Sequence, residues 1–434
     1  MNPLKLKLLK LIENQLIAGS AILFAGNMFA NFGNYLYHLL MGRMLGPIDY
    51  GILASLISFS YLISIPVNSL SLVVVKYVSA LRGKKDFGTI FYFYSWLNKK
   101  LVIFSLAGFL LLIIISPLIA SFLHLKSILP LLLIITSSLV GVYFMVNVTT
   151  LQGFLRFGLM SISGAVQVVL KLGIAVLLVY LGWKVLGAVL AFLVSALIGY
   201  LLTAFFVRRL FERKKERKKT INSQEIVRYA VPVFFSTLAF TSLYTTDIVL
   251  VRHFLPAQEA GFYAALATLG KIIFFASSPI IMVMFPMVSE RHANGKKYIN
   301  LLSLSLGLVL LTCLGISGIY FLFPKLMINI LYGRQYLSAS PYLFLFAIFL
   351  SLYSLSSLLV NFYLSVKKVK VVVLPVIAAA AQVILIFLFH QSLSQIVWVS
   401  ISILSLLLIS LLVYYIYSDN KTKKAPTFSY RSRL

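Results

Sequence analysis

The chain has 434 residues, of which 61% are hydrophobic and only 11% are charged, and this composition excludes an ordinary soluble protein. Its formal net charge of +28 resembles that of a nucleic-acid-binding protein, but the basic residues flank long apolar segments. We therefore exclude nucleic acid as a partner and attribute the charge to membrane topology, with binding of anionic membrane lipids as a second effect.

Apolar segments long enough to cross a bilayer, roughly 20 residues each, recur along the whole chain. Strand alternation is absent, and lipid offers no partner to an unpaired backbone group, so these segments are expected to be helices. We predict an all-α polytopic membrane protein with twelve transmembrane helices, at residues 17–41, 51–79, 101–123, 127–150, 159–181, 185–207, 227–251, 261–288, 299–322, 340–363, 371–390 and 394–417.

Lysine and arginine are distributed unevenly over the junctions between these spans. Most of them lie at the termini and the even junctions, and six lie at the odd junctions: Arg43, Lys126, Lys184, Arg252, Lys325 and Arg334. Because basic loops stay in the cytoplasm, both termini are expected there, in a multi-pass protein of the cell (inner) membrane. The apolar and basic start of the chain predicts an interfacial helix before the first span.

The first span carries polar residues on one helix face. Asn27, Asn31, Asn34 and His38 follow the spacing i, i+4, i+7 and i+11. Such a stripe either forms hydrogen bonds between helices or lines a cavity, and both alternatives are open. The second and eighth spans are interrupted by Pro66 and Pro279, which predicts a bend in each.

A lysine lies near the middle of the fifth span. A charge at this depth costs roughly 2.5–3.5 kcal/mol on insertion scales, so Lys171 is expected to face a wet cavity and to attract anions. Gln167, one turn earlier, extends the same polar face. The basic segment 208–220 that follows the sixth span is predicted to be a cytoplasmic connector.

The seventh and eighth spans hold the other intramembrane charges. Asp247 is the one acid within a span, with Thr241 and Thr245 mostly on the same side of its helix, and Lys271 lies in the next span. Asp247 either forms an ion pair with Lys271 or acts as a lumen carboxylate that binds H⁺ or Na⁺ as a coupling ion. Both alternatives are open.

Two stretches in equivalent places of the two halves are alike. LGPIDYGILASL (Leu45–Leu56) and LPAQEAGFYAAL (Leu255–Leu266) share the pairs Leu45/Leu255, Gly51/Gly261, Ala54/Ala264 and Leu56/Leu266. The similarity predicts a parallel duplication, typical of transporters. We expect two six-helix lobes related by a pseudo-two-fold axis, at residues 1–207 and 221–418, followed by a basic tail at 419–434.

Enzyme signatures and metal-ligand patterns are absent from the sequence. It has no Walker-type loop, no nucleophile elbow and no paired loop acids for glycosyl chemistry. The single cysteine, Cys313, excludes a thiolate cluster, and the five histidines are scattered. We therefore expect a transporter that is not an enzyme, has no catalytic residues and uses no metal or cofactor.

Four segments resemble prokaryotic polysaccharide-biosynthesis flippases of the multidrug/oligosaccharidyl-lipid/polysaccharide exporter superfamily. They are RMLGPIDYGILASL and its continuation to Asp86, LQGFLRFG (Leu151–Gly158), the region of Asp247, and FPMVSE (Phe285–Glu290). The resemblance implies a V-shaped pair of lobes around a central cavity that opens alternately to each side. It also implies transport of a polyprenyl-pyrophosphate-linked oligosaccharide from the cytoplasmic to the outer leaflet, for surface polysaccharide or glycan assembly.

Within that resemblance, Lys171 and Lys271 would offset the pyrophosphate charge, and the asparagine stripe would meet sugar hydroxyls. A glycan polymerase is an expected partner, and the protein is expected to act as a monomer. The alternative function is an ion-coupled multidrug or small-molecule exporter of the same superfamily. An exporter of cations needs an acidic lumen, whereas here two lysines accompany one aspartate.

Overall fold

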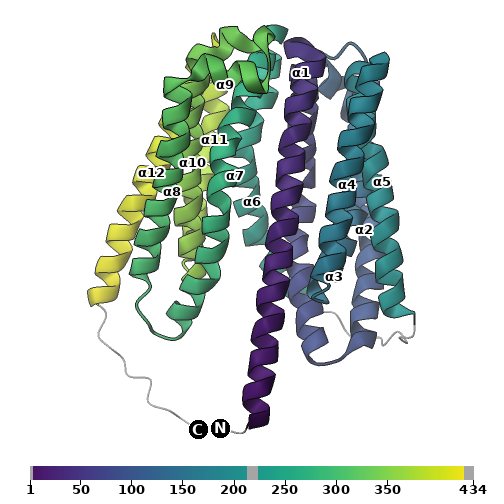
Figure 1. Ribbon diagram of the computed structural model, residues 1–434, viewed down its shortest axis with the longest axis vertical. Coiled ribbons are helices and arrows are strands. Elements are labelled where there is room, and N and C mark those ends of the chain that lie inside the picture. Colours follow the sequence, from purple (N-terminus) through teal and green to yellow (C-terminus); the bar gives the residue numbers. More distant parts are fainter. Residues whose placement is uncertain (1–2, 213–222, 425–434) are drawn as a thin grey trace. The chain divides into compact units, whose positions relative to one another are not determined.

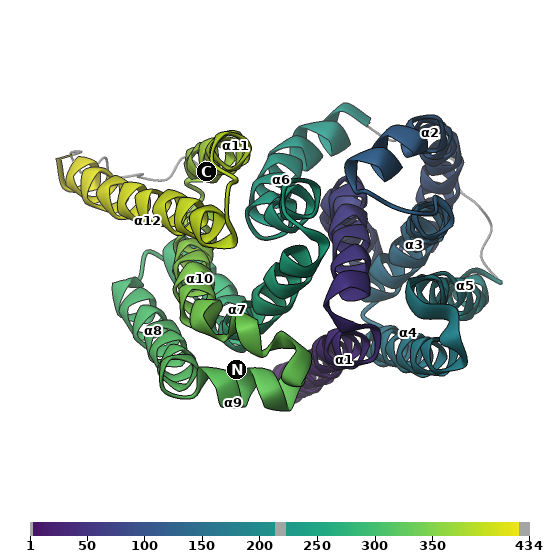
Figure 2. The same ribbon diagram turned by 90° about the horizontal axis from the view of Figure 1, so that it is seen from above.

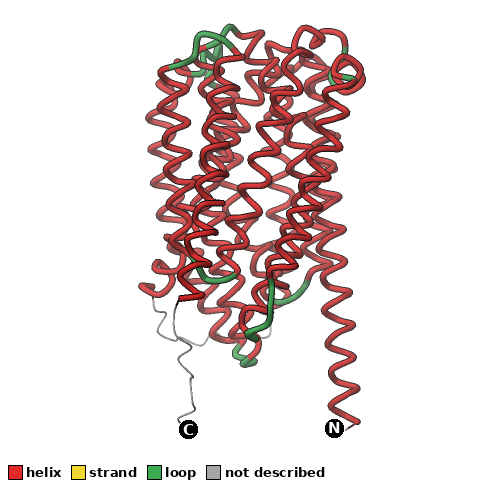
Figure 3. The backbone as a smooth tube through the Cα atoms, turned by 90° about the vertical axis from the view of Figure 1, so that its left-hand side faces the viewer, coloured by secondary structure: helices red, strands yellow, loops and turns green. Residues whose placement is uncertain are grey.

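The computed structural model describes residues 3–212 and 223–424, within which the regular elements are helices joined by short loops (Figures 1 and 3). The predicted connector 208–220 and tail 419–434 lie largely outside the described residues. The elements are α1 (Pro3–Gly83), α2 (Phe87–Phe122), α3 (Leu129–Gly153), α4 (Phe157–Leu178), η1 (Val179–Trp183), α5 (Lys184–Phe211), α6 (Ser223–Phe254), α7 (Ala257–Ala293), α8 (Ile299–Leu322), α9 (Pro324–Leu331), η2 (Arg334–Tyr342), α10 (Leu343–Ser365), η3 (Val369–Val372), α11 (Val373–Leu388) and α12 (Leu393–Lys424).

The twelve predicted spans occur in the described residues as ten candidate membrane-spanning helices. Two of the ten, Ile22–Gly83 with 62 residues and Phe157–Phe211 with 55 residues, each contain two predicted spans. Gly46 (φ 73°) breaks the first of them and Gly182 (φ 89°) breaks the second, at left-handed backbone angles that glycine adopts without strain. The prediction of an all-α membrane protein with twelve spans is therefore confirmed.

Packing divides the chain into two compact units. The first unit consists of Met1–Thr268 with Lys325–Pro341, and the second consists of Leu269–Pro324 with Tyr342–Leu434. The first unit thus includes α6, the first turns of α7, α9 and η2 in addition to the helices that precede them. The lobe boundaries predicted from the sequence, the V shape and the central cavity stay predictions.

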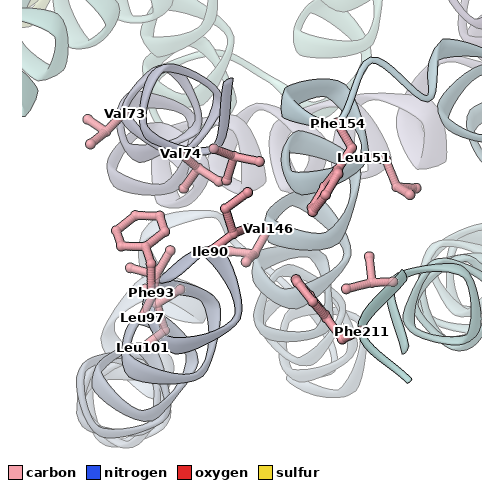
Figure 4. Close-up of a cluster of buried hydrophobic side chains, with 12 residues drawn as sticks. Val73, Val74, Ile90, Phe93, Leu97, Leu101, Val146, Leu151, Phe154 and Phe211 are labelled. Carbon is pink, nitrogen blue, oxygen red and sulfur yellow. The ribbon is translucent and has the colours of Figure 1, made fainter. Parts of the chain in front are cut away.

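In the first unit, α3, α4 and α5 pack beside α1, and α2 packs against α3 (Figure 2). An apolar cluster fixes one end of this bundle (Figure 4). Its aromatic members Phe93, Phe154 and Phe211 come from α2, from the residue after α3, and from α5. In lipid the hydrophobic effect gives no drive between helices, so close contact between such side chains supplies the stabilisation.

In the second unit, α10 packs against both α8 and α12, and α11 packs against α12. Side-chain hydrogen bonds reinforce these contacts. The hydroxyl of Tyr363 in α10 donates to the Leu411 carbonyl of α12 at 2.7 Å, and Gln382 Nε2 in α11 donates to Ser400 Oγ of α12 at 3.0 Å. Polar contacts of this kind connect helices in the membrane at about 0.6 kcal/mol each.

The two glycines that coincide in the sequence repeat touch each other in the first unit. A Cβ atom on Gly51 would lie 2.9 Å from the Gly261 nitrogen, and one on Gly261 would overlap the backbone of Pro47. Contact between equivalent residues of two repeats is expected where a two-fold axis passes between them. The contact therefore supports the predicted parallel duplication.

Alanine at Gly51 is expected to destabilise the protein by about 1–3 kcal/mol, because its methyl group would meet the Gly261 backbone, which cannot rotate away. Thermal unfolding of the purified protein in detergent measures the effect as a lowered Tm. Gly315→Ala is the matched control, since a Cβ there meets open space and alanine favours the helix. An unchanged Tm in Gly51→Ala would show that the close approach is not required.

Two arginines bind helix ends from the opposite half of the sequence. Arg43, just before the break in α1, donates Nε to the Leu331 carbonyl at 3.1 Å, and its Nη2 donates to the carbonyls of Asn329 and Ile330, all at the end of α9. Arg252 of α6 donates Nε to the Leu123 carbonyl at 3.0 Å, just after α2. We call these two sets of contacts the arginine clamps.

The second arginine clamp includes two histidines. Arg252 Nη2 also donates to the His124 carbonyl at 3.3 Å, and the rings of His124 and His253 stack with centroids 5.3 Å apart. Carbonyls at a helix C-terminus carry partial negative charge and have no partner within the helix, so cations stabilise them. The Arg43 clamp thus joins the end of the first span to the short helix that follows the ninth span, and the Arg252 clamp joins the end of the seventh span to the end of the third.

Candidate functional site

Two glycines of α1 allow α4 to approach closely. A Cβ on Gly26 would overlap the Ser161 side chain, and a Cβ on Gly33 would overlap Val168. Gly26 and Gly33 are seven residues apart, as are Ser161 and Val168, so both contacts lie on one face of each helix. Small residues at this spacing bring membrane helices together, and here they align the polar face of α1 with the middle of α4.

The close approach brings the Lys171 ammonium to the asparagine stripe. Lys171 Nζ donates a hydrogen bond to Asn34 Oδ1. It also lies 5.1 Å from the centroid of the Tyr37 ring and 4.7 Å from that of Phe192 in α5. An amide oxygen and two aromatic faces attract a cation without neutralising it. The positive charge is therefore held in place and remains available to an anion.

Lys171 lines a cavity of about 310 Å³ within the first unit. The volume falls within the range of about 300–1,000 Å³ that is typical of small-molecule sites. The lining contains one cation and no acid. Its polar members come from four helices: Ser60, Tyr61, Ser64 and Asn68 of α1, Ser137 and Ser138 of α3, Gln167 and Lys171 of α4, and Ser195 of α5.

The serine hydroxyls of the cavity are arranged as hydrogen-bond acceptors. Ser60, Ser64 and Ser195 each donate to a carbonyl of their own helix, at 2.7, 2.8 and 3.0 Å. A hydroxyl that has given its hydrogen to the backbone keeps its lone pairs for a ligand. The cavity therefore offers one positive charge, two amides and several acceptor oxygens, which suits an anionic group next to hydroxyl groups.

Of the predicted lining residues, Gln167 and Lys171 line this cavity, and Asn34 accepts a hydrogen bond from Lys171. Asn27 and Asn31 are half-buried in the earlier turns of α1. His38 lies one turn beyond Asn34, where its Nδ1 is 3.1 Å from the Tyr50 hydroxyl, and that hydroxyl shares a hydrogen bond with Thr268 at 3.0 Å. His38 thus belongs to a separate polar cluster, and the roles of all these residues stay predictions.

The predicted coupling residues occupy a different part of the first unit. Asp247 is 1% exposed, and its Oδ2 accepts a hydrogen bond from the Tyr263 hydroxyl at 2.8 Å. Thr245 and Thr241 are buried two and six residues before Asp247 on the same helix, and the Thr245 hydroxyl donates to the Thr241 carbonyl at 2.5 Å. Lys271 is half-buried in α7 and belongs to the second unit, so its ion pair with Asp247 stays a prediction.

A second polar stripe on α1 was missed by the sequence analysis. Ser60, Ser64 and Asn68 follow the spacing i, i+4 and i+8, and all three line the cavity. The periodicity that identified Asn27, Asn31 and Asn34 also identifies this stripe, if serine counts as polar. The serines of α3 and α5 give no such signal, because isolated serines are common in membrane helices.

Comparisons with known proteins agree with this architecture. Residues 40–341 match a protein family described as "Polysaccharide biosynthesis protein". This segment includes every residue that lines the cavity. No curated protein sequence matches the chain.

Solved structures with the same fold include three transporters. The lipid II flippase MurJ in an inward closed conformation is 15% identical, with a TM-score of 0.73, over 92% of this chain and 87% of that chain. An inward-facing multidrug resistance MATE transporter of the MOP superfamily is 14% identical, with a TM-score of 0.72, over 91% and 96%. A third, from Pyrococcus furiosus, is described as having a binding pocket of reverse polarity that suggests a different function, with 16% identity and a TM-score of 0.63 over 93% and 95%.

At these identities the structural likeness shows the fold alone, which is that of MOP-superfamily transporters. The family match extends over most of the 434 residues, and it therefore shows the family as well as the fold. The chain belongs to the polysaccharide biosynthesis protein family.

Proposed function

We propose that this protein is a flippase that moves a polyprenyl-pyrophosphate-linked oligosaccharide from the cytoplasmic to the outer leaflet, for assembly of a surface polysaccharide or glycan. The observation that carries the proposal is the cavity around Lys171, where one cation and several acceptor oxygens line a space within a membrane-spanning bundle. A phosphate or pyrophosphate binds the ammonium, and sugar hydroxyls donate to the serine and amide oxygens. Family membership supports the same class of cargo.

A cation exporter fits the cavity less well. An organic cation binds where a carboxylate offsets its charge, and the lining here has a lysine instead. The protein is proposed to work without chemistry on its cargo, in the cell membrane, with both termini in the cytoplasm. A membrane-embedded polymerase is the expected consumer of the translocated lipid-linked unit.

Reconstitution into proteoliposomes tests the proposed function. A polyprenyl-pyrophosphate-linked saccharide with a fluorescent label on the sugar is placed in both leaflets, and a membrane-impermeant quencher reports the outer fraction. Protein-dependent loss of the protected fraction is expected, whereas a labelled quaternary ammonium compound should not be moved. Transport of the ammonium compound without movement of the lipid would replace the flippase by an exporter.

We propose further that Asp247 couples transport to an ion gradient. Asp247→Asn is expected to abolish stimulation by an imposed H⁺ or Na⁺ gradient while the variant still equilibrates the lipid between leaflets, because an amide neither titrates nor offsets a bound cation. Tyr263→Phe is the matched control, since it removes one hydrogen bond to the carboxylate but keeps its charge. Full gradient stimulation in Asp247→Asn would remove the coupling role.

A further inference from the structure

An apolar groove lies beside the cavity and has no role in the binding of a saccharide or phosphate. Its volume is about 420 Å³, and it runs between α1, α2 and α3. Its walls are Ile63, Pro66, Val67 and Leu70 of α1, then Leu101, Phe104, Ser105, Gly108, Phe109 and Leu112 of α2, and Ile135, Ser138, Leu139 and Val142 of α3. Twelve of these fourteen residues carry no side-chain polar group.

The two serines of the groove already have partners. Ser105 shares a hydrogen bond with the Tyr143 hydroxyl at 2.9 Å, and the Ser138 hydroxyl donates to the Ile134 carbonyl at 2.8 Å. A polar ligand would therefore lose its hydration in this groove and find few partners. A hydrocarbon chain loses nothing, and it gains van der Waals contacts along the walls.

The groove and the cavity share one wall. Four residues line both spaces: Ile63 and Val67 of α1, and Ser138 and Val142 of α3. The two spaces are therefore adjacent, one lined by the Lys171 side chain and the other lined by apolar side chains. An anionic head next to an apolar chain matches that sequence of surfaces.

The groove also meets the lipid-facing surface. Phe104, one of its wall residues, is 72% exposed. Beside it, Gly108 leaves space, because a Cβ built there has no heavy atom within 4 Å. A chain can therefore enter from the surrounding lipid between α2 and its neighbours without leaving an apolar environment.

We propose that this groove holds the hydrocarbon chain of the lipid-linked substrate next to its phosphate, while the phosphate lies at Lys171. The inference rests on the proposed function, and it adds that the substrate is held at two points within the first unit. The chain is then positioned on the same helices as the head group, so that both move with one set of helices during transport.

Filling the groove tests the proposal. Gly108→Phe places a ring in the open space, and we expect it to lower translocation of a polyprenyl-diphosphate-linked monosaccharide by about tenfold, through about 1.4 kcal/mol of lost positioning. An analogue with a single five-carbon prenyl unit on the diphosphate, which leaves most of the groove empty, should be moved at an unchanged rate. Gly315→Phe in α8 is the matched control, since it also enters open space but lines neither the groove nor the cavity.

Photolabelling gives a readout that does not depend on a folded variant. A polyprenyl-diphosphate sugar with a diazirine in its chain is expected to label α2 around Phe104 and Gly108 in the wild-type protein, and unlabelled substrate should compete. Labelling by a diazirine phosphatidylcholine that the substrate fails to compete would assign the groove to an ordinary membrane lipid and overturn the proposal. If the wild-type protein moves neither substrate, the flippase function itself is overturned. If Gly108→Phe changes the rates of both substrates equally relative to the wild type, only the proposed role of the groove is overturned.

Discussion

Replacing Lys171 with methionine is expected to reduce translocation of the lipid-linked saccharide by about 10- to 100-fold. Methionine has nearly the same length and fills the same space, so the change removes the charge with little effect on packing. The lost interaction is a charge-assisted hydrogen bond to phosphate, worth about 1.5–3 kcal/mol. Initial rates in proteoliposomes at saturating and subsaturating substrate measure it, and the larger effect is expected below saturation.

Two further variants separate the effect of the Lys171 charge from the effect of its surroundings. Lys171→Arg keeps the charge but needs more room between Tyr37 and Phe192, so partial activity is expected. Lys100→Met, at an exposed position of α2, removes an equal charge away from the cavity and should leave the rate unchanged. Wild-type transport by Lys171→Met, or an equal loss in Lys100→Met, would show that the cavity does not bind the anionic head.

The sequence was sufficient to predict the spans, and it indicated Lys171 as a candidate cavity residue. Both predictions depend on the high cost of placing a charge or an unpaired backbone group in lipid, which leaves a strong signal in one short segment. The distance of Lys171 along its helix follows from counting residues. Its partners do not, because Asn34 and Phe192 reach it through the packing of three helices.

The site of Asp247 shows the same limit. The sequence predicts that this carboxylate is shielded from lipid but cannot say which neighbour shields it. In the structure Tyr263, at the start of the next helix, donates to it. Tyrosines are numerous in the chain, with 24 in total, so no local pattern distinguished this one.

The arginine clamps were also outside the reach of the sequence. In the sequence, Arg43 and Arg252 are two of the six basic residues of the odd junctions, and nothing else distinguishes them. Their acceptors are main-chain carbonyls, which every residue has, and Arg43 is 288 residues from Leu331 along the chain. The short helix α9, whose end Arg43 binds, was expected to be part of a junction.

The positions of the clamps suggest what they do. Both arginines lie at odd junctions, which the charge distribution predicts to be on the outer side of the membrane. Each clamp joins segments from opposite halves of the sequence, and transporters of this kind are expected to separate such segments when they open. We therefore expect the clamps to stabilise one of the two states of an alternating-access cycle.

Replacing Arg252 with alanine is expected to shift that equilibrium by about 10- to 100-fold toward the state in which the clamp is open. Arg252 is 5% exposed and its guanidinium supplies two hydrogen bonds, so its removal leaves the carbonyls of Leu123 and His124 without this donor. A buried hydrogen bond to a charged group is worth about 1.5–3 kcal/mol, and the shift follows from that energy. Arg43→Ala should act in the same direction but less strongly, because Arg43 is exposed.

The shift is measured as the labelling rate of a buried cysteine by a membrane-impermeant maleimide. Thr268→Cys in a Cys313→Ser background places the thiol in the polar cluster with Tyr50. There it is protected from the maleimide while the clamps are closed. Arg291→Ala is the matched control, because Arg291 also binds a carbonyl, that of Lys297, but only six residues away in the same half. Since both clamps bias one equilibrium, their free energies should add in the double variant. Equal labelling rates in the double variant and in Arg291→Ala would mean that the clamps hold local structure and do not select a state.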